Sequence, residues 1–338
     1  MTAVKTTTIA GFFDEDLAPL VRRMADRPRA EGGDGDQDSR EIRAMVWQGL
    51  AGLGALDAAN PAANPAADPA ADPAADPAAD PAADTVRLAE LLGSVLYQGP
   101  LLDTLTALEL FGNDDIGQAP VALAVADEPW SSGPDGAISA RRAFVGFAAE
   151  VDYFVVGGAD TGGPRLALVR AGHPSITMRR YEETSRGEAY EVEFTDTPVA
   201  AWAATGWEAA LANARVRQAA YLVGLAQAAL DHAVGHAKTR RQFGRPIGKF
   251  QGLAFRLSEL SMHIDATRLL VHDRDAAAHA AADLAAASDL ARTVTTQTMQ
   301  VNGAAGMRSD NDAQLYYRWA AVESVRLGTP SQLRRESW

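Results

Sequence analysis

The sequence predicts an α+β protein in which a small helical domain, a β domain and a four-helix bundle follow one another along the chain. Apolar residues recur at helical spacing before residue 118, and short apolar or alternating runs separated by Gly, Pro and Asp fill 119–203. Long helix-period segments joined by short turns occupy 204–338, as in an antiparallel bundle. A chain of 338 residues is long enough to divide its core among several layers.

The predicted N-terminal domain, 1–118, contains an insertion. Four segments have the spacing of amphipathic helices: Phe13 to Met24, Glu41 to Leu56, Val86 to Tyr97 and Leu101 to Leu110. Between the second and third, residues 60–84 repeat Asn/Asp-Pro-Ala-Ala, and each proline removes a backbone donor and disfavours helix just before it. We expect a disordered acidic loop over 60–84; a partner-binding role is the alternative.

The β domain, 119–203, and the bundle, 204–338, are predicted from their apolar patterns. Five segments read as strands: Val121 to Val125, Ala143 to Phe147, Tyr153 to Val156, Leu166 to Val169 and Tyr190 to Phe194. Four segments read as bundle helices: Val216 to Val234, Phe250 to about Ala282, Leu284 to Asn302 and a shorter one from Asp312 to about Val325.

Composition excludes several classes of function. The chain has no cysteine, which rules out disulfides, thiolate metal sites and cysteine nucleophiles, and we expect no metal centre. The formal charge of −13 disfavours general binding of nucleic acid. The first twenty residues lack the apolar core of a signal peptide, and no apolar run is long enough to span a membrane. The expectation is a cytoplasmic protein without membrane partners.

A basic turn at 240–251 is the most specific motif. Taken alone, cations at a helix C-terminus complement the helix dipole, and Gly244 caps the helix. The complete order Arg-x-Gln-Phe-Gly-x-Pro-Ile-x-x-Phe-Gln, however, resembles the turn between the first two long C-terminal helices of the acyl-CoA dehydrogenase family. These flavoenzymes oxidise acyl thioesters between the α and β carbons. The resemblance is strong over 215–334 and moderate over 121–200, and it implies the predicted order of domains.

The resemblance implies a site for FAD. Arg240 would contact the pyrophosphate, for which a guanidinium is geometrically suited, and Gln242 and Phe243 would lie beside the dinucleotide. The segment from Gln300 through Gly303 to Gly306 is similar to the family's Gln-x-x-Gly-Gly-x-Gly, which contributes to FAD binding across the dimer, with Ala304 in place of one glycine.

The β domain and the C-terminal segment carry the rest of the implied flavin site. The run Arg142 to Asp152 is similar to a family strand pair in which Phe144 would cover the flavin ring, with Gly146 where the family has threonine. The loop 127–129 is similar to one that receives substrate. Thr329 and Arg334 belong to a cofactor-proximal segment.

The family's catalytic base is missing. Dehydrogenation requires a carboxylate that removes the α proton while the β carbon loses hydride. The usual position of this glutamate is Leu327, and the position used by a minority of members is Ala214. Arg215, the next residue, aligns with an arginine near the acyl thioester, with a solvated helix-face arginine as the alternative. Glu323, one helical turn before Leu327, is a candidate displaced base.

Two classes of function follow. The first is an FAD-binding acyl-CoA dehydrogenase-like enzyme that acts on an acyl-CoA or acyl-carrier-protein thioester, as a homodimer, a tetramer or one subunit of a heteromer whose partner supplies the base. The second is a non-oxidative cyclase, dehydratase or isomerase on an acyl or polyketide-like substrate, or an inactive scaffold subunit. Four other side chains are proton carriers by type, although helical spacing favours surface or packing roles for them: Asp231, His232, His236 and Asp265.

Overall fold

The computed structural model describes residues 35–52, 55–56, 81–125, 130–133, 136–160, 163–181, 188–203, 206–273, 275–308 and 311–337. The chain forms two compact units, and each is described by itself. The helical unit comprises Met1–Val46, Ala83–Tyr97 and Arg215–Trp338; the β unit comprises Trp47–Ala82 and Gln98–Ala214. Within the described ranges, no helix combines the length and apolarity required to cross a bilayer.

The β unit contains two four-stranded sheets that share one core. The first sheet has the order β1-β4-β5-β8 and the second the order β2-β3-β7-β6. The T-shaped pair of Phe154 and Phe194, with ring centroids 5.5 Å apart, joins the two sheets in the core. The strands are β1 (Val121–Ala124), β2 (Ser131–Ser132), β3 (Ile138–Gly146), β4 (Tyr153–Asp160), β5 (Gly163–Arg170), β6 (Ile176–Arg180), β7 (Ala189–Thr197) and β8 (Ala201–Trp202).

Helices precede the strands. Helix α5 (Leu101–Phe111) lies beside β1, where the Asp103 carboxylate accepts the Leu123 N–H at 3.1 Å. The short α6 (Asn113–Ile116) follows it, and α3 (Gly35–Gly52) crosses the unit boundary.

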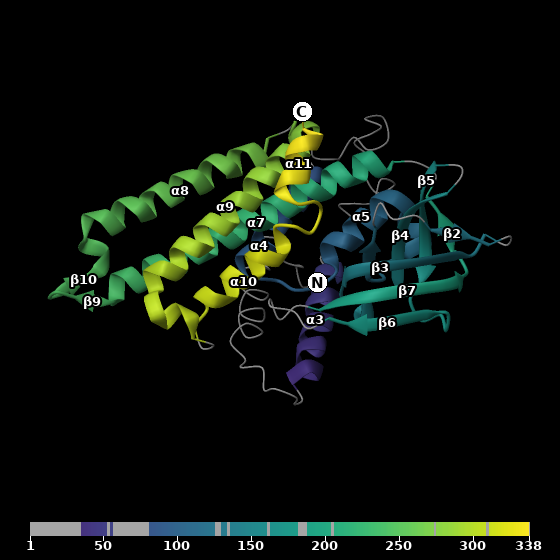
Figure 1. The fold of residues 1–338 in the computed structure, drawn as a ribbon, viewed down its shortest axis with the longest axis horizontal. Coiled ribbons are helices and arrows are strands. Elements are labelled where there is room, and N and C mark those ends of the chain that lie inside the picture. The colour runs from purple at the N-terminus through teal and green to yellow at the C-terminus, as the bar shows by residue number, and fades with distance from the viewer. Residues whose placement is uncertain are drawn as a thin grey trace, which may run out of the picture. The chain divides into compact units, whose positions relative to one another are not determined.

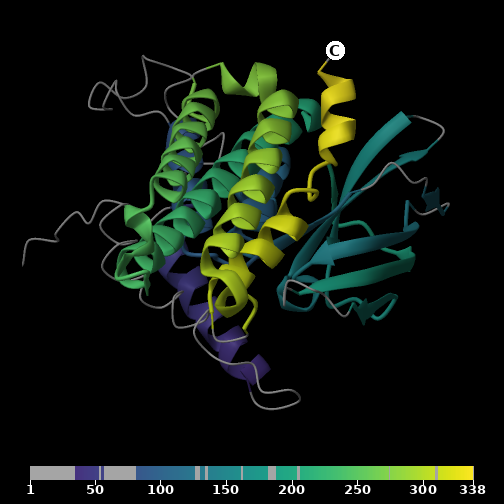
Figure 2. The same cartoon turned by 60° about the vertical axis from the view of Figure 1, so that its left-hand side comes forward.

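In the helical unit, the four consecutive helices between residues 207 and 323 reverse direction at each connection (Figures 1 and 2). Arg256, near the start of one helix, donates to Gln297, near the end of the next, at 2.8 Å, as antiparallel neighbours require. The buried residues of these helices recur at three and four, which places them on an inner face. The helices are α4 (Pro81–Ser94), α7 (Trp207–Thr239), α8 (Gln251–Val271), α9 (Ala280–Asn302), α10 (Ala313–Glu323) and α11 (Pro330–Glu336).

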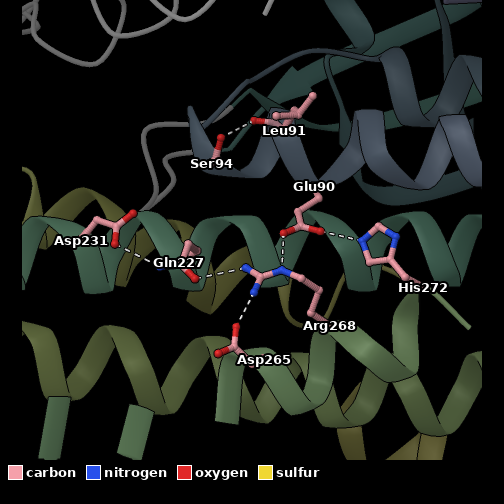
Figure 3. A network of polar contacts seen from close by, with 8 residues as sticks. All are labelled: Glu90, Leu91, Ser94, Gln227, Asp231, Asp265, Arg268 and His272. Carbon is pink, nitrogen blue, oxygen red and sulfur yellow. Dashed lines mark hydrogen bonds and ion pairs between the residues drawn. The ribbon is translucent and has the colours of Figure 1, made fainter. Parts of the chain in front are cut away.

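Helix α4 crosses α7 at two glycines. A Cβ added at Gly93 would overlap the Tyr221 carbonyl oxygen, and one added at Gly224 would overlap the Glu90 carbonyl oxygen. A polar network then fixes α4 to α8 (Figure 3): the Glu90 carboxylate accepts from Arg268 at 2.7 Å and contacts His272 at 2.6 Å. Burial raises the pKa of Glu90, but these two hydrogen bonds outweigh burial and lower it. Close backbone packing against α7 and a charged clamp to α8 thus both hold α4 in place.

The predicted fold class is confirmed, and two local predictions need comment. Helix α4 begins at Pro81, inside the repeat predicted to be disordered, because proline is tolerated in the first turn of a helix. The predicted helix from Phe250 to Ala282 is wrong in extent: α8 ends at Val271, and α9 begins at Ala280. The Asp273 carboxylate accepts the Asp275 N–H at 2.9 Å, a local bond that competes with helix continuation.

Several predictions lie outside the described residues. These are the helix at 13–24, the repeat over 60–80 and the loop at 127–129. The domain boundaries at 118 and 203 stay predictions. Strands β2, β6 and β8 and helices α6 and α11 were not predicted, because they are short or lack alternating burial.

Candidate functional site

The basic turn folds as a β-hairpin at the end of the bundle (Figure 1). Strands β9 (Arg241–Gln242) and β10 (Arg245–Pro246) pair antiparallel across Phe243 and Gly244. Both turn residues have positive φ, 50° and 79°, as a type I′ turn requires. The Ile247 N–H donates to the Arg240 carbonyl at 2.8 Å and closes the loop. The sequence order Phe-Gly therefore fixes a tight projection between α7 and α8.

The hairpin presents an aromatic ring and unengaged positive charge to solvent. Phe243 is 91% exposed, and its ring is T-shaped to Phe250 with centroids 6.1 Å apart. Arg241 is used within the hairpin, where it donates to the Gly244 carbonyl at 3.1 Å. The Arg240 side chain is exposed and, among the residues the structure describes, makes no hydrogen bond or ion pair. The Arg240 guanidinium is therefore available to an anion.

The segment after α9 lies at the same end of the bundle. Gly303 ends α9 with φ 60°, and its N–H donates to the carbonyls of Gln300 and Met299. Gln300 and Ala304 are exposed. Because Gln297 bonds Arg256 near the start of α8, this segment lies near the helix that follows the hairpin. The structure thus brings two of the sequence-predicted cofactor segments to one end of the helical unit.

Arg215 and Leu327 meet at the other end of α7. Arg215 Nε donates to the Leu327 carbonyl at 3.4 Å, and Nη1 lies 2.7 Å from Glu336 Oε2. The Arg215 side chain is 13% exposed, whereas that of Glu336 is 50% exposed. Sequence reasoning missed Glu336, because no local signal links the last turn of α11 to a residue on α7. Leu327, the predicted position of the absent base, thus lies beside a guanidinium that already has a carboxylate partner.

Thr329 begins the helix that brings Glu336 to this place. Its hydroxyl accepts the Gln332 N–H at 3.3 Å, and Gln332 Oε1 accepts the Thr329 N–H at 2.9 Å, a complete capping box. Leu333 is buried, and Arg334 forms an ion pair with Asp289 of α9. The Thr329 hydroxyl, which was predicted to lie near the cofactor, therefore also caps α11.

Glu323 lies in the bundle interior. It is 5% exposed, and its Oε2 accepts from Gln218 Nε2 at 2.8 Å. The same Gln218 amide donates to the Glu323 carbonyl at 3.0 Å. Burial and, second, the Glu323 charge raise the pKa of the nearby Tyr221 hydroxyl well above its usual value. Glu323 therefore joins α10 to α7 from a position that substrate cannot readily reach.

The two groups are far apart within one chain. Arg215 and Arg240 are separated by twenty-five residues of one helix, which is about 37 Å at 1.5 Å per residue. The hairpin group contains Arg240, Gln242, Phe243, Gln300 and Gly303. The α11 group contains Arg215, Glu323, Leu327 and Thr329.

Phe144 belongs to the β unit. It lies at a register shift between β3 and β7, with a φ of 55°, and it is 74% exposed. Its ring stacks on Tyr181 with centroids 4.8 Å apart. A positive φ in a bulky residue is strained backbone of the kind found at ligand sites. Tyr181 follows β6, which β7 separates from β3 in the sheet. It was not predicted, because stacking across an intervening strand leaves no sequence motif.

The structure shows what surrounds the four other side chains that could carry a proton. Asp231 accepts from Gln227 at 3.0 Å, Asp265 pairs with Arg268 at 2.7 Å, and His232 contacts Asn311 at 3.3 Å. Burial, followed by the charges of His232 and Arg240, lowers the pKa of His236. In the part of the chain that the structure describes, no three His, Asp or Glu side chains converge as a metal site would need.

Comparison with known proteins shows what the C-terminal part of the chain is similar to. A model of the acyl-CoA dehydrogenase C-terminal domain matches residues 205–336. This part of the chain is therefore similar to acyl-CoA dehydrogenases. The probable acyl-CoA dehydrogenase fadE25 of Mycobacterium leprae is 37% identical over 143 residues, which are 39% of this chain and 36% of the relative. The alignment thus spans just over a third of that acyl-CoA dehydrogenase.

Two further comparisons bear on chemistry and assembly. The 3-sulfinopropanoyl-CoA desulfinase of Cupriavidus necator is 34% identical over 129 residues, 36% of this chain and 33% of the relative. A solved chain of the ChsE4-ChsE5 complex from Mycobacterium tuberculosis superposes with a TM-score of 0.73. That alignment covers 99% of this chain and 96% of the solved chain, and at 20% identity it shows the fold alone.

Proposed function

We propose that this protein is an FAD-binding, acyl-CoA dehydrogenase-like enzyme subunit that acts on an acyl thioester. The observation that carries the proposal is Arg240. In a chain of net charge −13, this exposed guanidinium has no partner among the described residues, and it sits beside an exposed aromatic ring at the family position for FAD. A free cation next to a stacking surface fits a dinucleotide.

The proposed cofactor residues and the proposed substrate residue lie toward opposite ends of α7. Arg240, Gln242 and Phe243 would hold the pyrophosphate and its neighbouring groups, assisted by the segment at Gln300 and Gly303. Arg215 would face the acyl thioester, and Phe144 would cover the flavin ring. When bound, FAD would supply the acceptor for the hydride from the β carbon. About 37 Å of helix separates Arg240 from Arg215, which favours a site completed between subunits.

The α proton needs a base from outside this chain. Leu327 and Ala214 bear no carboxylate, and Glu323 is held in the interior by Gln218. A partner subunit is therefore our preferred source of the base, and a two-chain complex with the same fold, such as ChsE4-ChsE5, is a precedent for assembly. The acyl carrier in this proposal is CoA or an acyl carrier protein.

A second candidate follows from the desulfinase relative. Its name describes removal of a sulfinate group from an acyl-CoA, so C-terminal sequence similarity at 34% identity extends beyond proteins named dehydrogenases. A chain without the usual base could perform a non-oxidative reaction on an acyl thioester as a cyclase, dehydratase or isomerase, or serve as an inactive scaffold.

The visible absorption spectrum of the purified protein tests the proposal, followed by denaturation and identification of any released flavin. We expect bound FAD, and we expect Arg240→Ala to lower its content. Arg87→Ala is the matched control, because Arg87 is a 71% exposed arginine of the same unit, on α4. Absence of FAD after reconstitution, alone and with a co-expressed related chain, would refute the dehydrogenase proposal and leave the non-oxidative one.

A further inference from the structure

One aromatic ring backs another at the bulge of β3. The Phe144 ring is stacked on Tyr181, with centroids 4.8 Å apart and an angle of 23° between the planes. Phe144 is nevertheless 74% exposed. An aromatic ring has two faces, and Tyr181 covers one of them. The other face of Phe144 is therefore the one that is open to a planar ligand.

Tyr181 is held by a polar network across three strands. Its hydroxyl donates to Glu191 Oε2 on β7 at 3.2 Å. The same oxygen accepts from Arg141 of β3 at 2.6 Å and from Arg179 of β6 at 3.2 Å. The Arg179 guanidinium also lies 5.2 Å from the centroid of the Tyr181 ring. Tyr181 is thus fixed through its hydroxyl as well as through its ring.

The charges of this network keep the Tyr181 hydroxyl a hydrogen-bond donor. The hydrogen bond from Arg141, followed by that from Arg179, lowers the pKa of Glu191, so the carboxylate is ionised at neutral pH. Partial burial, followed by the hydrogen bond to Glu191, raises the pKa of Tyr181, so the phenol keeps its proton. An ionised acceptor and a protonated donor form the stronger, charge-assisted kind of hydrogen bond.

The conformation of Phe144 needs support from its surroundings. Its φ of 55° lies in the left-handed region that bulky residues rarely adopt. Such a backbone conformation persists only where neighbouring groups fix it. An exposed phenylalanine ring would otherwise exchange rotamers, and ordering that ring during binding would cost affinity. A ring that is already held avoids this cost, so the stack with Tyr181 preorganises Phe144.

We propose that Tyr181 is a positioning residue, which holds the Phe144 ring in the orientation that receives the flavin ring and leaves one face of Phe144 open to it. The inference rests on the proposed function, because it takes Phe144 as the ring that covers the flavin. It adds a residue that touches Phe144 rather than the cofactor. Arg141, Arg179 and Glu191 act one step further away, through the Tyr181 hydroxyl.

Replacement of Tyr181 in the FAD-loaded protein tests this role. Tyr181→Ala removes the stack, and we expect it to weaken FAD binding by roughly 3–10-fold, because the ligand must then order Phe144. Tyr181→Phe keeps the ring and loses the hydroxyl, and it should restore most of that affinity. The visible circular dichroism of bound FAD reports the asymmetric surroundings of the isoalloxazine ring. This spectrum should change in Tyr181→Ala and stay close to that of the wild type in Tyr181→Phe.

Tyr153 provides the matched control. This tyrosine of β4, in the first sheet, also has an arginine over its ring: the Arg170 guanidinium lies 5.3 Å from the centroid. Tyr153→Ala should therefore lose a similar ring contact and leave FAD affinity and the visible spectrum unchanged. Urea unfolding compares the stabilities of the variants. Tyr181→Leu, which keeps apolar bulk without an aromatic face, replaces Tyr181→Ala if the alanine variant does not fold.

Two results would overturn the inference and leave the proposed function standing. One is that Tyr181→Ala or Tyr181→Leu binds FAD with the affinity and the visible circular dichroism of the wild type. The other is an equal change in Tyr153→Ala. A wild-type protein that binds no FAD after reconstitution, alone or with a related chain, would overturn both proposals. The amount of FAD bound by the wild type therefore separates the two failures.

Discussion

The crossing of α4 and α7 gives the most direct test of the fold, through Gly224→Ala. The added methyl carbon would overlap the Glu90 carbonyl oxygen and lie 2.9 Å from the Glu90 carbonyl carbon and 3.0 Å from the Ser94 nitrogen. Ordinary contact begins near 3.4 Å. Since all three atoms are backbone, no side chain can rotate away. Helix α4 would therefore have to withdraw by roughly 1 Å or bend.

That movement also affects the clamp. Withdrawal by roughly 1 Å stretches the Glu90 contacts to Arg268 and His272, now 2.7 and 2.6 Å, beyond hydrogen-bonding distance. Overpacking costs about 1–3 kcal/mol, and a lost hydrogen bond to a charged group costs about 1.5–3 kcal/mol. The better helix propensity of alanine returns about 1 kcal/mol. The expected net loss in free energy of unfolding is therefore about 1.5–5 kcal/mol.

Urea unfolding followed by far-UV circular dichroism measures this loss against a control in the same helix. Gly235 is exposed, and a Cβ there would meet no atom within 4 Å. Gly235→Ala should therefore stabilise the protein by about 0.5–1 kcal/mol, from propensity alone. The reasoning fails if Gly224→Ala is as stable as the wild type, or if the two variants shift the midpoint in the same direction.

Three further predictions concern the C-terminal helices. Thr329→Ala removes the capping box and should lower the free energy of unfolding, measured by urea titration, by about 1 kcal/mol. An unchanged urea midpoint would show that the capping box does not stabilise the protein. Burial raises the pKa of Asp283 to about 6, so ionising this carboxyl opposes folding as the pH rises from about 4 to 6. Asp283→Asn should thus stabilise the protein at pH 7 by about 1 kcal/mol after allowance for solvent screening. Thermal unfolding measures this gain in stability, which should disappear near pH 4; a gain that does not change with pH would refute the reasoning. Leu327→Glu returns a carboxylate beside Arg215 and should raise exchange of the acyl α proton in D₂O at least ~100-fold by NMR; no gain in a variant that still binds acyl-CoA would place the substrate elsewhere.

The sequence predicted those parts of the fold whose signals are local. The hairpin was placed correctly between two helices because Gly244 and its neighbours specify a tight turn. Strands β1, β4, β5 and β7 were found from their apolar runs. The end of α8 was missed because 276–287 is nearly all alanine, interrupted by His279, Asp283 and Leu284. Its helical pattern does not distinguish one helix from the next.

The candidate site was predictable only where it follows a motif. Arg240, Phe243 and Gly303 come from ordered runs, and the structure gives each a defined backbone setting. Glu336 could not be predicted, because its contact with Arg215 joins residues 121 positions apart. The burial of Glu323 by Gln218 was hidden for the same reason: pairing between helices leaves no spacing rule.

The contact between Arg215 and Glu336 explains how the arginine can persist without the base. A guanidinium only 13% exposed is costly unless a carboxylate or carbonyl compensates its charge. In the proposed assignment Leu327 occupies the position of the family glutamate, and its apolar side chain cannot compensate the charge of Arg215. The Leu327 carbonyl and the Glu336 carboxylate supply it instead, and the capped helix that begins at Thr329 brings Glu336 into place. In the proposed assignment, the charge of Arg215 is therefore balanced without a glutamate at position 327, and we expect a carboxylate delivered by a partner to meet an arginine that is already positioned.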